Sequence, residues 1–519
     1  MSANSVTPAV GTEARPLPRH VDVLVVGAGI SGIGMACHLT TKQPGRTFAV
    51  LDGRAAIGGT WDLFRYPGIR SDSDLHTFGY EFKPWTKKNA IADAHEIMDY
   101  LHETIDEYGL ADRIHLGHKV ISADFANDAG VWTVTVQRTE DDQQFTMTCG
   151  WLFSACGYYD YDGGYSPAFE GQDDFAGQVV HPQAWPENLD YTGKKVVVIG
   201  SGATAVTLIP AIAEQAGHVT MLQRSPTYVM SLPKQDPIAN TLNRLLPEAL
   251  AYRLTRRLNI KLRSLLYTAS QRYPDAVRRF IRHGVAKALP ADFDVDTHFN
   301  PHYNPWEQRL CVVPDGDLFA AISRGTASVV TDRIQRFTER GVLLAGGEEL
   351  QADIIVTATG LQLLPYGGIA LSVDGQEVDL NAALVYKALM LSGVPNFAFA
   401  IGYTNSSWTL KVDLVAEHLC RLLAHMDRHG HTVAVPVDDD PSVQRRPLFD
   451  FGAGYVQRTA DLFPLQGSHG PWTMPQSYAV DRDRLRHGPV EDPALRLRST
   501  TAVTANDVAR EGDPAGVPA

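Results

Sequence analysis

Three glycines follow a short apolar stretch near the start of the chain, in the order Gly27-x-Gly29-x-x-Gly32. Residues 21–26 (VDVLVV) predict a buried strand, and the residues after the last glycine predict a helix. In such a unit the glycines allow a tight turn, a close backbone approach to a pyrophosphate and close packing of helix on strand. Asp52 ends the next predicted strand, where a carboxylate accepts hydrogen bonds from ribose hydroxyls. The pattern predicts a dinucleotide site.

The same pattern recurs in the middle of the chain as Gly200-x-Gly202-x-x-Ala205, again after an apolar strand. Here the second strand ends in Gln-Arg-Ser instead of an acid. A carboxylate at this place would repel a 2′-phosphate, whereas Arg224 and Ser225 can bind one. A charge-assisted hydrogen bond of this kind contributes about 1.5–3 kcal/mol. The second site is therefore predicted to bind NADPH rather than NADH.

Residues 58–74 (GGTWDLFRYPGIRSDSD) combine small, flat and charged side chains in one loop. Gly58 and Gly59 allow the backbone to lie close to a flat ligand. The flat and charged positions are Trp61, Tyr66, Pro67, Arg70 and Asp72. An ordinary polar loop is the alternative interpretation. Since one bound dinucleotide can take a hydride from another, we expect FAD at the first site and NADPH at the second.

The bulk composition narrows the class of protein. A chain of 519 residues exceeds what one core organises, so two or three domains are expected. The formal net charge of -13 gives no overall basic surface for nucleic acid. Five cysteines without a CxxC pair argue against a metal site or a dithiol centre and favour reduced thiols. With no signal peptide in the polar first 20 residues, a cytoplasmic location is expected.

Each dinucleotide half is predicted to end in a small antiparallel unit followed by a separate apolar strand. The two strands close in similar triplets, Ala155-Cys156-Gly157 and Ala358-Thr359-Gly360. The predicted fold class is therefore α/β, with two Rossmann-like domains and a helical insertion at about 235–300 in the second. The predicted order is a flexible tail (1–20), the first part of the FAD domain (21–165), a linker (166–193), the NADPH domain (194–360), the returning FAD part (361–440) and a C-terminal extension with a flexible end (441–519).

The helical insertion carries a basic cluster of Arg253, Arg256, Arg257, Lys261 and Arg263. The plainest interpretation is a solvated helix face. A cover over a substrate channel and a patch that contacts a membrane surface are the alternatives.

Residues 175–186 (FAGQVVHPQAWP) show neither a strand nor a helix period. Pro182 and Pro186 restrict the residues before them, His181 and Trp185, to extended conformations. We interpret the segment as a stiffened linker between the domains. A positioning role for His181 is preferred to proton transfer.

Together these motifs resemble those of Baeyer–Villiger monooxygenases, a class of flavoprotein monooxygenases, and among them the ethionamide-activating bacterial enzymes. The resemblance covers about residues 20 to 490. It includes both glycine turns and a [AG]GxWxxxxYPGxxxD segment from Gly58 to Asp72. The family fingerprint FxGxxxHxxxW[PD] is met by Phe175, Gly177, His181, Trp185 and Pro186.

The resemblance implies a reaction. NADPH would reduce FAD, O2 would form a C4a-peroxyflavin, and the peroxide would convert a ketone to an ester or lactone. Sulfides or thioamides are further expected substrates. Arg309, in PWEQRLC, resembles the active-site arginine that stabilises the negative charge, and Asp72 would orient it.

The resemblance also implies a set of cofactor-binding residues. At the FAD site these are Gly27, Gly29, Ser31, Gly32, Asp52, Gly59, Thr60, Trp61, Arg70, Ser71, Asp72 and Val120. At the NADPH site they are Gly200, Ser201, Gly202, Ala203, Thr204, Ala205, Val206, Arg224 and Ser225. The loop 402–408 (GYTNSSW) is expected to aim a helix N-terminus at the flavin.

Two other functions compete with this one. A flavin-containing monooxygenase would oxygenate only N or S, and a non-catalytic flavin protein would sense redox state. Product analysis with a ketone and a thioether would distinguish a flavin-containing monooxygenase from a Baeyer–Villiger enzyme. An NADPH oxidation assay with and without ketone would distinguish a non-catalytic flavin protein from either enzyme. The sequence names neither the substrate nor the oligomeric state.

Overall fold

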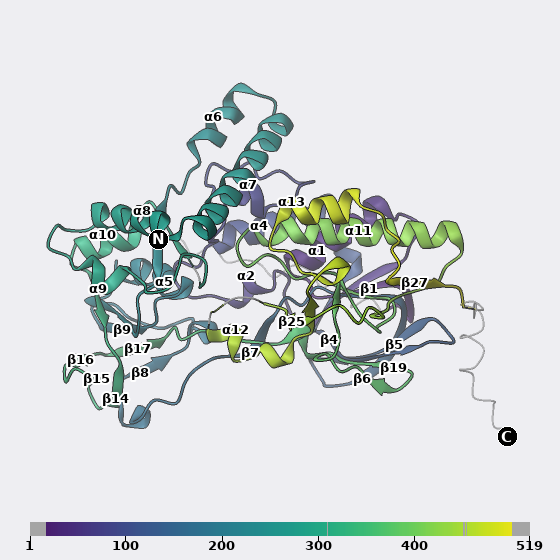
Figure 1. Ribbon diagram of the computed structural model, residues 1–519. Helices are drawn as coiled ribbons and strands as arrows, with labels where there is room; N and C mark the ends of the chain where they lie inside the picture. The colour runs from purple at the N-terminus through teal and green to yellow at the C-terminus, as the bar shows by residue number, and fades with distance from the viewer. Residues whose placement is uncertain (1–16, 309, 450–451, 453, 501–519) are drawn as a thin grey trace, which may run out of the picture.

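The computed structural model describes residues 17–308, 310–449, 452 and 454–500. Two α/β domains lie side by side, the first on the right and the second on the left of Figure 1. The predicted α/β class with two dinucleotide-type domains is confirmed. Of the tails predicted to be flexible, residues 1–16 and 501–519 lie outside the described residues.

The first domain is built on a nine-stranded mixed sheet. The strand order is β20-β19-β4-β5-β6-β1-β2-β3, and β23 also pairs with β6. The strands are β1 (His20–Val26), β2 (Phe48–Asp52), β3 (Ile114–Leu116), β4 (His118–Ala126), β5 (Val131–Arg138), β6 (Gln144–Ser154), β19 (Ala370–Val373), β20 (Gln376–Glu377) and β23 (Phe397–Phe399). β3, β2, β1, β6 and β23 run parallel, so their carboxyl ends meet at one edge, as a dinucleotide site requires.

Both faces of β1 are buried, which explains its nearly continuous apolar sequence. Val23 and Val25 pack into a core with α1 (Ile30–Lys42), α4 (Ala94–Glu107) and α11 (Trp408–His429). Leu24 and Val26 pack into a second core with β4 and β5. The alternation of a strand thus divides one apolar run between two cores.

The predicted end of the first half is corrected in one respect. β6 is a single strand that pairs with antiparallel β5 through its first part and with parallel β1 through its second part. The antiparallel unit and the closing strand are therefore not separate here. A continuous strand forms because its apolar positions are covered along the whole length.

The second domain has a five-stranded parallel sheet in the order β13-β10-β9-β17-β8. Its strands are β13 (Ala327–Thr331), β10 (His218–Gln223), β9 (Lys195–Ile199), β17 (Ile354–Thr357) and β8 (Gln178–Val180). α5 (Ala203–Ile212) follows β9, and α10 (Asp317–Ser323) follows the pair β11 (Tyr228–Leu232) and β12 (Leu310–Pro314). A separate antiparallel unit is formed by β14 (Ile334–Thr338), β15 (Gly341–Leu344) and β16 (Glu349–Gln351).

One segment predicted as an irregular linker contributes to this sheet. Residues Gln178–Val180 form β8 and pair with β17 in parallel. β8 is an edge strand of only three residues, and so short a strand shows no alternation of apolar and polar residues in the sequence.

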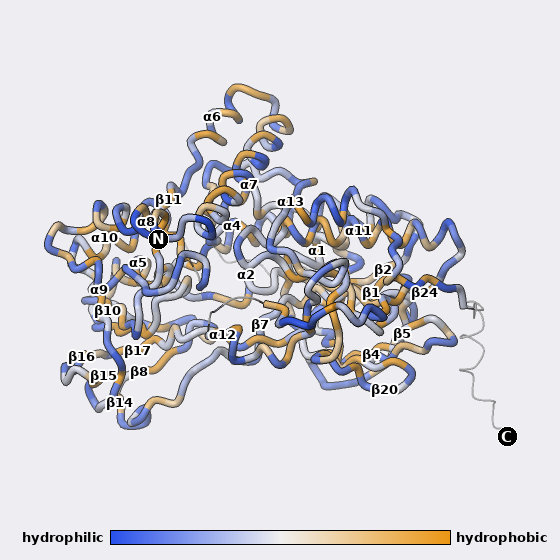
Figure 2. The backbone as a smooth tube through the Cα atoms, viewed as in Figure 1, coloured by the Kyte–Doolittle hydropathy of each residue, from blue (hydrophilic) through white to orange (hydrophobic). Residues whose placement is uncertain are grey.

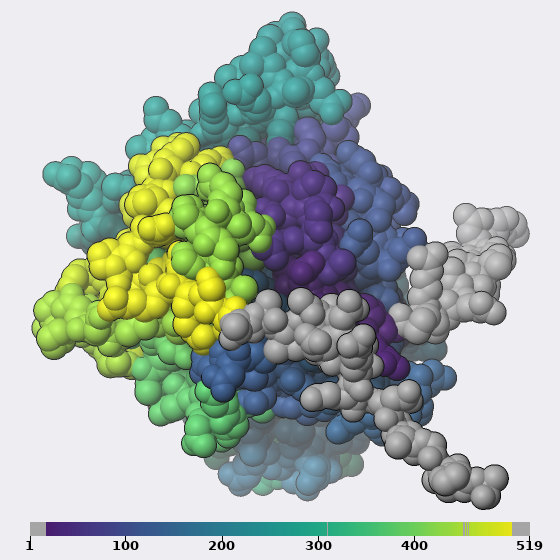
Figure 3. Space-filling model, turned by 90° about the vertical axis from the view of Figure 1, so that its right-hand side faces the viewer, coloured from purple at the N-terminus to yellow at the C-terminus, as the bar shows by residue number. Residues whose placement is uncertain are grey.

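The insertion consists of α6 (Pro237–Leu245), α7 (Glu248–Arg272), α8 (Pro274–Ala288) and α9 (Val295–Phe299). The α6–α7 hairpin projects beyond the two domains in both Figure 1 and Figure 3. No described helix has both the length and the apolar composition needed to cross a bilayer.

Two crossings join the domains. β7 (Tyr159–Gly164) leaves the first domain, β18 (Leu361–Leu363) returns to it, and the two strands pair antiparallel. The last part of the chain then packs beside α11, where Figure 3 shows it in yellow against light green. The elements of this last part are β24 (Val433–Pro436), β25 (Arg445–Pro447), α12 (Gly454–Gln457), β26 (Leu465–Gly467), α13 (Tyr478–Asp481) and β27 (Leu495–Arg498). Short elements of the first domain are α2 (Thr60–Leu63), α3 (Leu75–Phe78), β21 (Val385–Tyr386) and β22 (Met390–Leu391).

Candidate active site

A cavity of about 1040 Å³ lies between the two domains and receives side chains from both. Predicted site residues that line it are Gly27, Gly29, Ser31, Asp52, Gly59, Thr60, Trp61, Arg70, Ser71, Asp72, Val120, Gly202, Ala203 and Thr204. Predicted residues outside this lining are Gly32, Gly200, Ser201, Ala205, Val206, Arg224, Ser225 and the five of the fingerprint. The structure therefore brings the two glycine turns to one space.

The first turn leaves no room for a side chain at its first and third glycines. Gly27 has a φ of +108°, and a Cβ there would stand 2.7 Å from the carbonyl oxygen of Ala155. A Cβ on Gly32 would stand 1.8 Å from the carbonyl oxygen of Gly27. Gly29 is the N-cap of α1 and provides no side-chain cap, so the first amides of the helix are available to an anion.

Asp52 closes the same turn. Its Oδ2 accepts a hydrogen bond of 2.7 Å from the amide of Ala28, and its Oδ1 accepts one of 2.9 Å from the amide of Arg54. Burial raises the pKa of this carboxyl group, against the effect of the two amides. Each oxygen keeps acceptor capacity toward the cavity, as a ribose diol requires.

The loop after Gly58 brings a second backbone against the first turn. Gly58 has a φ of +100°, and Gly59 has a φ of +55°. A Cβ on Gly59 would lie 3.3 Å from the Cα of Gly29. Trp61 packs edge-on against Phe78, with ring centroids 5.6 Å apart. The loop thus forms a fixed wall of the cavity.

The two charged residues of this loop are held differently. Arg70 forms a bidentate pair with Asp317 of the second domain, at 2.5 and 3.3 Å. Asp72 accepts a 3.4 Å hydrogen bond from the hydroxyl of Ser73. Arg70 therefore bridges the domains, a partner that the sequence did not reveal.

Arg309 lies outside the described residues, and its contacts are not described. The nearby Trp306 and Leu310 both line the cavity. Residues before and after the predicted active-site arginine therefore belong to the cavity wall.

The loop 402–408, far along the chain from the first glycine turn, contacts that turn in the structure. The indole N–H of Trp408 donates a 2.8 Å hydrogen bond to the hydroxyl of Ser31. Thr404, Asn405 and Ser406 line the cavity just before α11 begins. Sequence reasoning found this loop but not the contact with Ser31, which joins residues 377 positions apart.

A buried charged cluster under this loop was missed from the sequence. Lys411 donates to Asp481 Oδ2 at 2.5 Å, and the Tyr403 hydroxyl donates to the same oxygen at 2.7 Å. Lys411 and Asp481 have no exposed side-chain surface. Burial lowers the pKa of Lys411, while Asp481 opposes that effect. The cluster ties the cavity loop to α13, and the only signal for it in the sequence was Lys411, which stands between Leu410 and Val412.

A group of tyrosines after β6 was also missed. Tyr158, Tyr159 and Tyr161 line the cavity. The Tyr161 hydroxyl lies 3.4 Å from the hydroxyl of Thr60, and burial raises the pKa of Tyr161 to about 12. The run GYYDYD directly after the strand end was the signal for this group.

The second turn is more open than the first. Gly200 has a φ of +133°, and a Cβ there would lie 2.3 Å from the carbonyl oxygen of Ala358. At Gly202 no atom lies within 4 Å of an added Cβ. Ser201 and Thr227 share a hydrogen bond of 2.8 Å between their hydroxyls. Space for a ligand therefore remains directly above Gly202.

The end of β10 carries the residues predicted to read a 2′-phosphate. Gln223, at the position equivalent to Asp52, turns inward and donates to the His298 carbonyl (2.8 Å) and the Thr331 hydroxyl (2.9 Å). Arg224 and Ser225 are exposed. In the described part of the chain, Arg224 pairs with no carboxylate. Its guanidinium is therefore available to an anionic ligand.

The fingerprint segment is anchored at three places. Phe175 packs edge-on against Phe337 in the second domain. His181 accepts from the Gln183 amide at Nδ1 (3.2 Å) and donates from Nε2 to the Gly360 carbonyl (3.3 Å), beside the paired crossings β7 and β18. His181 and Trp185 are both extended, as the prolines predicted. Burial lowers the pKa of His181, which favours this neutral form.

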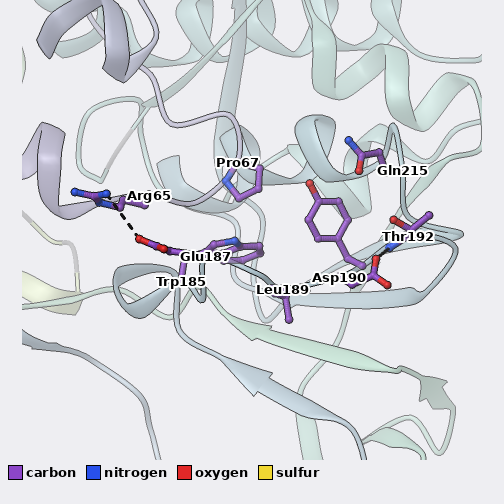
Figure 4. Close-up of a pocket in the computed structure, with 9 residues that line it drawn as sticks. Arg65, Pro67, Trp185, Glu187, Leu189, Asp190, Thr192 and Gln215 are labelled. Carbon is purple, nitrogen blue, oxygen red and sulfur yellow. Dashed lines mark hydrogen bonds and ion pairs between the residues drawn. The ribbon is translucent and has the colours of Figure 1, made fainter. Parts of the chain in front are cut away.

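The end of the fingerprint lies beside the loop that follows Gly58. A small pocket of about 380 Å³ lies where Trp185 and Glu187 meet Arg65 and Pro67 (Figure 4). Arg65 and Glu187 stand 4.0 Å apart across it. A Cβ on Gly177 would lie 2.4 Å from the carbonyl oxygen of Asp353, so this position also needs glycine. The segment therefore connects both domains, in agreement with a positioning role.

The basic cluster of the insertion is not simply a solvated face, which corrects the preferred interpretation. Arg256 is buried and donates to the carbonyl oxygens of His76 and Gly79 in the first domain, at 2.9 and 2.8 Å. Arg263 donates to Asp74 at 3.0 Å. Asn259, Leu262, Arg263 and Leu266 line the cavity. α7 is therefore a roof over the cavity, because a helix of 25 residues presents more than one face.

Two dinucleotide-type turns that open on one cavity are typical of flavoproteins that bind a second dinucleotide beside the flavin. The chain matches the flavin-binding monooxygenase-like family over residues 84–395 and an NAD(P)-binding Rossmann-like domain over residues 25–88. The FAD-containing monooxygenase EthA of Mycobacterium tuberculosis is 50% identical over 487 residues, 94% of this chain and 99% of that protein. The probable FAD-binding monooxygenase AlmA of Acinetobacter baylyi is 47% identical over 93% of this chain and 97% of that protein.

Solved structures share the fold. A steroid monooxygenase bound to NADP superposes with a TM-score of 0.72 at 22% identity, over 92% of this chain and all of that one. A cyclohexanone-bound cyclohexanone monooxygenase superposes with a TM-score of 0.72 at 20% identity, over 93% of this chain and all of that one. The chain belongs to the flavin-binding monooxygenase-like family and is a flavin monooxygenase, as the sequence motifs predicted.

Proposed function

We propose that the protein is an FAD- and NADPH-dependent monooxygenase that converts a ketone to an ester or lactone, and that also oxidises sulfides and thioamides. Ketone, O2, NADPH and a proton would give ester, NADP+ and water. The observation that carries the proposal is the single cavity reached by both glycine turns, through Gly29 and Gly202. Small-molecule chemistry between two bound dinucleotides needs such a shared space.

The first site has the donors and acceptors that FAD needs. The uncapped N-terminus of α1 suits the pyrophosphate, and Asp52 suits the ribose. The glycine loop and Trp61 form a wall for a flat ring. When bound, FAD would supply the activated oxygen and NADPH the two electrons.

The second site suits NADPH. Gly202 leaves room for the pyrophosphate at the uncapped N-terminus of α5. Arg224 and Ser225, exposed at the end of β10, would bind the 2′-phosphate.

We assign charge stabilisation to Arg309. Negative charge develops on the carbonyl oxygen of the substrate when that carbon is attacked, and a fixed cation lowers its energy. Arg70 is already paired with Asp317, whereas Asp72 lies in the cavity wall and would orient Arg309. His181 would hold the domain crossing and take no part in proton transfer.

A product screen tests the reaction. Purified protein with bound FAD is incubated with NADPH, O2 and either a simple ketone or a thioether. The proposal expects an ester from the ketone and a sulfoxide from the thioether. A sulfoxide without any ester would show a heteroatom oxygenase instead. If the protein forms neither product and does not oxidise NADPH, it is a non-catalytic flavin protein.

The variant Arg309→Ala tests the assigned residue. It should keep FAD and be reduced by NADPH, yet form ester about 10²–10³ times more slowly, the usual cost of removing a fixed charge-stabilising group. Stopped-flow reduction and product analysis separate the two steps. Arg333→Ala, at an exposed arginine of the second domain, is the matched control. An Arg309→Ala enzyme with normal ester formation would contradict the assignment.

A further inference from the structure

Exposed apolar side chains gather on one part of the molecule. Among the described residues, ten large hydrophobic side chains are markedly exposed, and eight of them lie within residues 237–288. Six belong to the α6–α7 hairpin, namely Ile238, Leu245, Leu250, Leu254, Leu262 and Leu265. Figure 2 shows these hydrophobic stretches on the hairpin that projects from the two domains. A monomer surface rarely concentrates apolar side chains in this way without a partner.

We define the outer face of the hairpin by a stripe along α7. Leu250, Leu254, Arg257, Lys261 and Leu265 recur every three or four residues and are all exposed. This spacing places them on one side of the helix. Leu265 is 55% exposed, so the part of the chain that the structure describes does not cover the stripe.

The opposite side of α7 is already occupied. Asn259 and Leu266 line the cavity, and Arg256 is buried against the first domain. The helix therefore uses one face to roof the cavity, and no described residue covers its outer face.

The charge of the hairpin region opposes that of the whole chain. Residues 237–288 contain eleven Lys and Arg but only two Asp and Glu, while the chain carries a formal charge of -13. Arg244, Arg253, Arg257 and Lys261 are exposed on the hairpin. Within the described ranges, none of these four pairs with a carboxylate. The outer face is thus apolar and cationic on an otherwise acidic protein.

We propose that the outer face of the α6–α7 hairpin docks on the surface of an anionic lipid bilayer. Leucines on such a helix enter the boundary between headgroups and acyl chains, and the flanking arginines and lysine meet the phosphates. A solvated face would carry polar residues in place of the leucines. A second copy of this chain would bring like charges together, because the stripe includes Arg257 and Lys261. The protein would lie on the bilayer and not span it.

The cavity opens beside this face. Ile238 and Leu262 line the cavity, and each is 50% exposed. An apolar ketone dissolved in the bilayer would reach the cavity along the hairpin with little contact with water. This delivery step rests on the proposed function, whereas the docking does not.

Vesicle co-sedimentation tests the docking. The FAD-loaded full-length protein is mixed with vesicles of phosphatidylglycerol and phosphatidylcholine, or of phosphatidylcholine alone. We expect binding to the anionic vesicles that is at least tenfold stronger and that weakens as salt increases. Equal or absent binding to both compositions would overturn the proposal.

Two double variants locate the surface. Leu250→Gln with Leu254→Gln removes apolar contact, and Arg253→Glu with Arg257→Glu reverses charge. Each should weaken binding at least tenfold while FAD content and thermal unfolding stay normal, since all four side chains are exposed and none of them lines the cavity. Leu462→Gln and Arg324→Glu, at exposed positions elsewhere, should leave binding unchanged. Unaltered binding in both hairpin variants would overturn the assignment.

Two further measurements separate the alternatives. If size-exclusion chromatography with light scattering shows a dimer that the Leu250→Gln, Leu254→Gln variant dissociates, a second copy covers the face and the lipid proposal fails. For delivery, the charge-reversed variant should lose activity only on a long-chain ketone in vesicles and not on a short water-soluble ketone. An equal loss on both ketones would overturn delivery. Vesicle binding without any ketone turnover would contradict the proposed function while leaving docking intact.

Discussion

The two glycine turns share one design but are held in different ways. At the first turn Gly32 excludes any side chain, Asp52 bonds to the amides of the turn, and Trp408 reaches Ser31 from the far end of the chain. At the second turn Ala205 replaces the third glycine. The first site is enclosed by distant pieces of chain, as suits a resident cofactor. The second is open, as suits a cofactor that exchanges.

The open end of the second site shows the same difference. Gln223 stands where Asp52 stands in the first site but bonds to His298 and Thr331 rather than to its own turn. Arg224 remains exposed beyond it. The residue that ends the second strand therefore closes the turn in the first domain, whereas in the second domain it turns inward and the arginine after it stays exposed.

The largest expected effect comes from exchanging the third residue of each turn. Gly32→Ala should abolish FAD retention, because its Cβ would stand 1.8 Å from the carbonyl oxygen of Gly27. Ala205→Gly should cost only about 1 kcal/mol, the penalty of a glycine in a helix, and should keep FAD. Flavin absorbance per chain and thermal unfolding measure both. Normal flavin content in Gly32→Ala would break the comparison.

The next effect concerns the buried cluster that holds the returning loop. Lys411→Met would leave Asp481 unpaired in the interior and should destabilise the protein by about 3–5 kcal/mol. Combining Lys411→Met with Asp481→Asn should recover most of this loss, because no unpaired charge remains and Tyr403 keeps an acceptor. Denaturant unfolding measures the free energies. Equal stability of the single and the double variant would refute an ion-pair role.

A smaller effect is expected at the open site. Arg224→Ala should raise the Michaelis constant for NADPH about 10- to 100-fold, the value of one charge-assisted bond, and leave that for NADH unchanged. Steady-state kinetics with both cofactors measure the change, and Arg333→Ala provides a surface control. A rise of similar size for NADH would show that Arg224 does not read the 2′-phosphate.

The smallest effect concerns the ion pair between Arg263 of α7 and Asp74 of the first domain. Burial raises the pKa of Asp74, but Arg263 with Asn259 and Thr77 lowers it further, so the net direction is down. A depressed carboxyl pKa stabilises the folded state above the unfolded value of about 3.9, and this contribution is lost as pH falls through the folded value.

Arg263→Gln should therefore cost about 1 kcal/mol at pH 7, as expected for a partly exposed pair. The difference from the natural chain should be smaller at pH 3, because Asp74 loses its charge as pH falls toward its lowered pKa. Denaturant midpoints at the two pH values measure it. A difference of the same size at both pH values would show packing rather than charge.

Much of the architecture was predictable because it depends on local pattern. The glycine turns, the apolar strands before them and the returning strand and helix are each encoded in a few adjacent residues. β8 was not predictable, since three residues carry no period and their pairing partner is β17, far along the chain. The basic cluster was misread because burial of Arg256 depends on carbonyl groups of residues 76–79.

The sequence by itself determined the class of protein, the two dinucleotide turns and the residues that distinguish them. Those features follow from steric limits on glycine and from charge, which act within a few residues. The tertiary structure alone decided that both turns open on one cavity, that Arg70 pairs with Asp317 and that Lys411 meets Asp481. It also decided that α7 roofs the site while its outer face is left exposed by the described residues. Such contacts join distant residues, and only the packing of the domains brings them together.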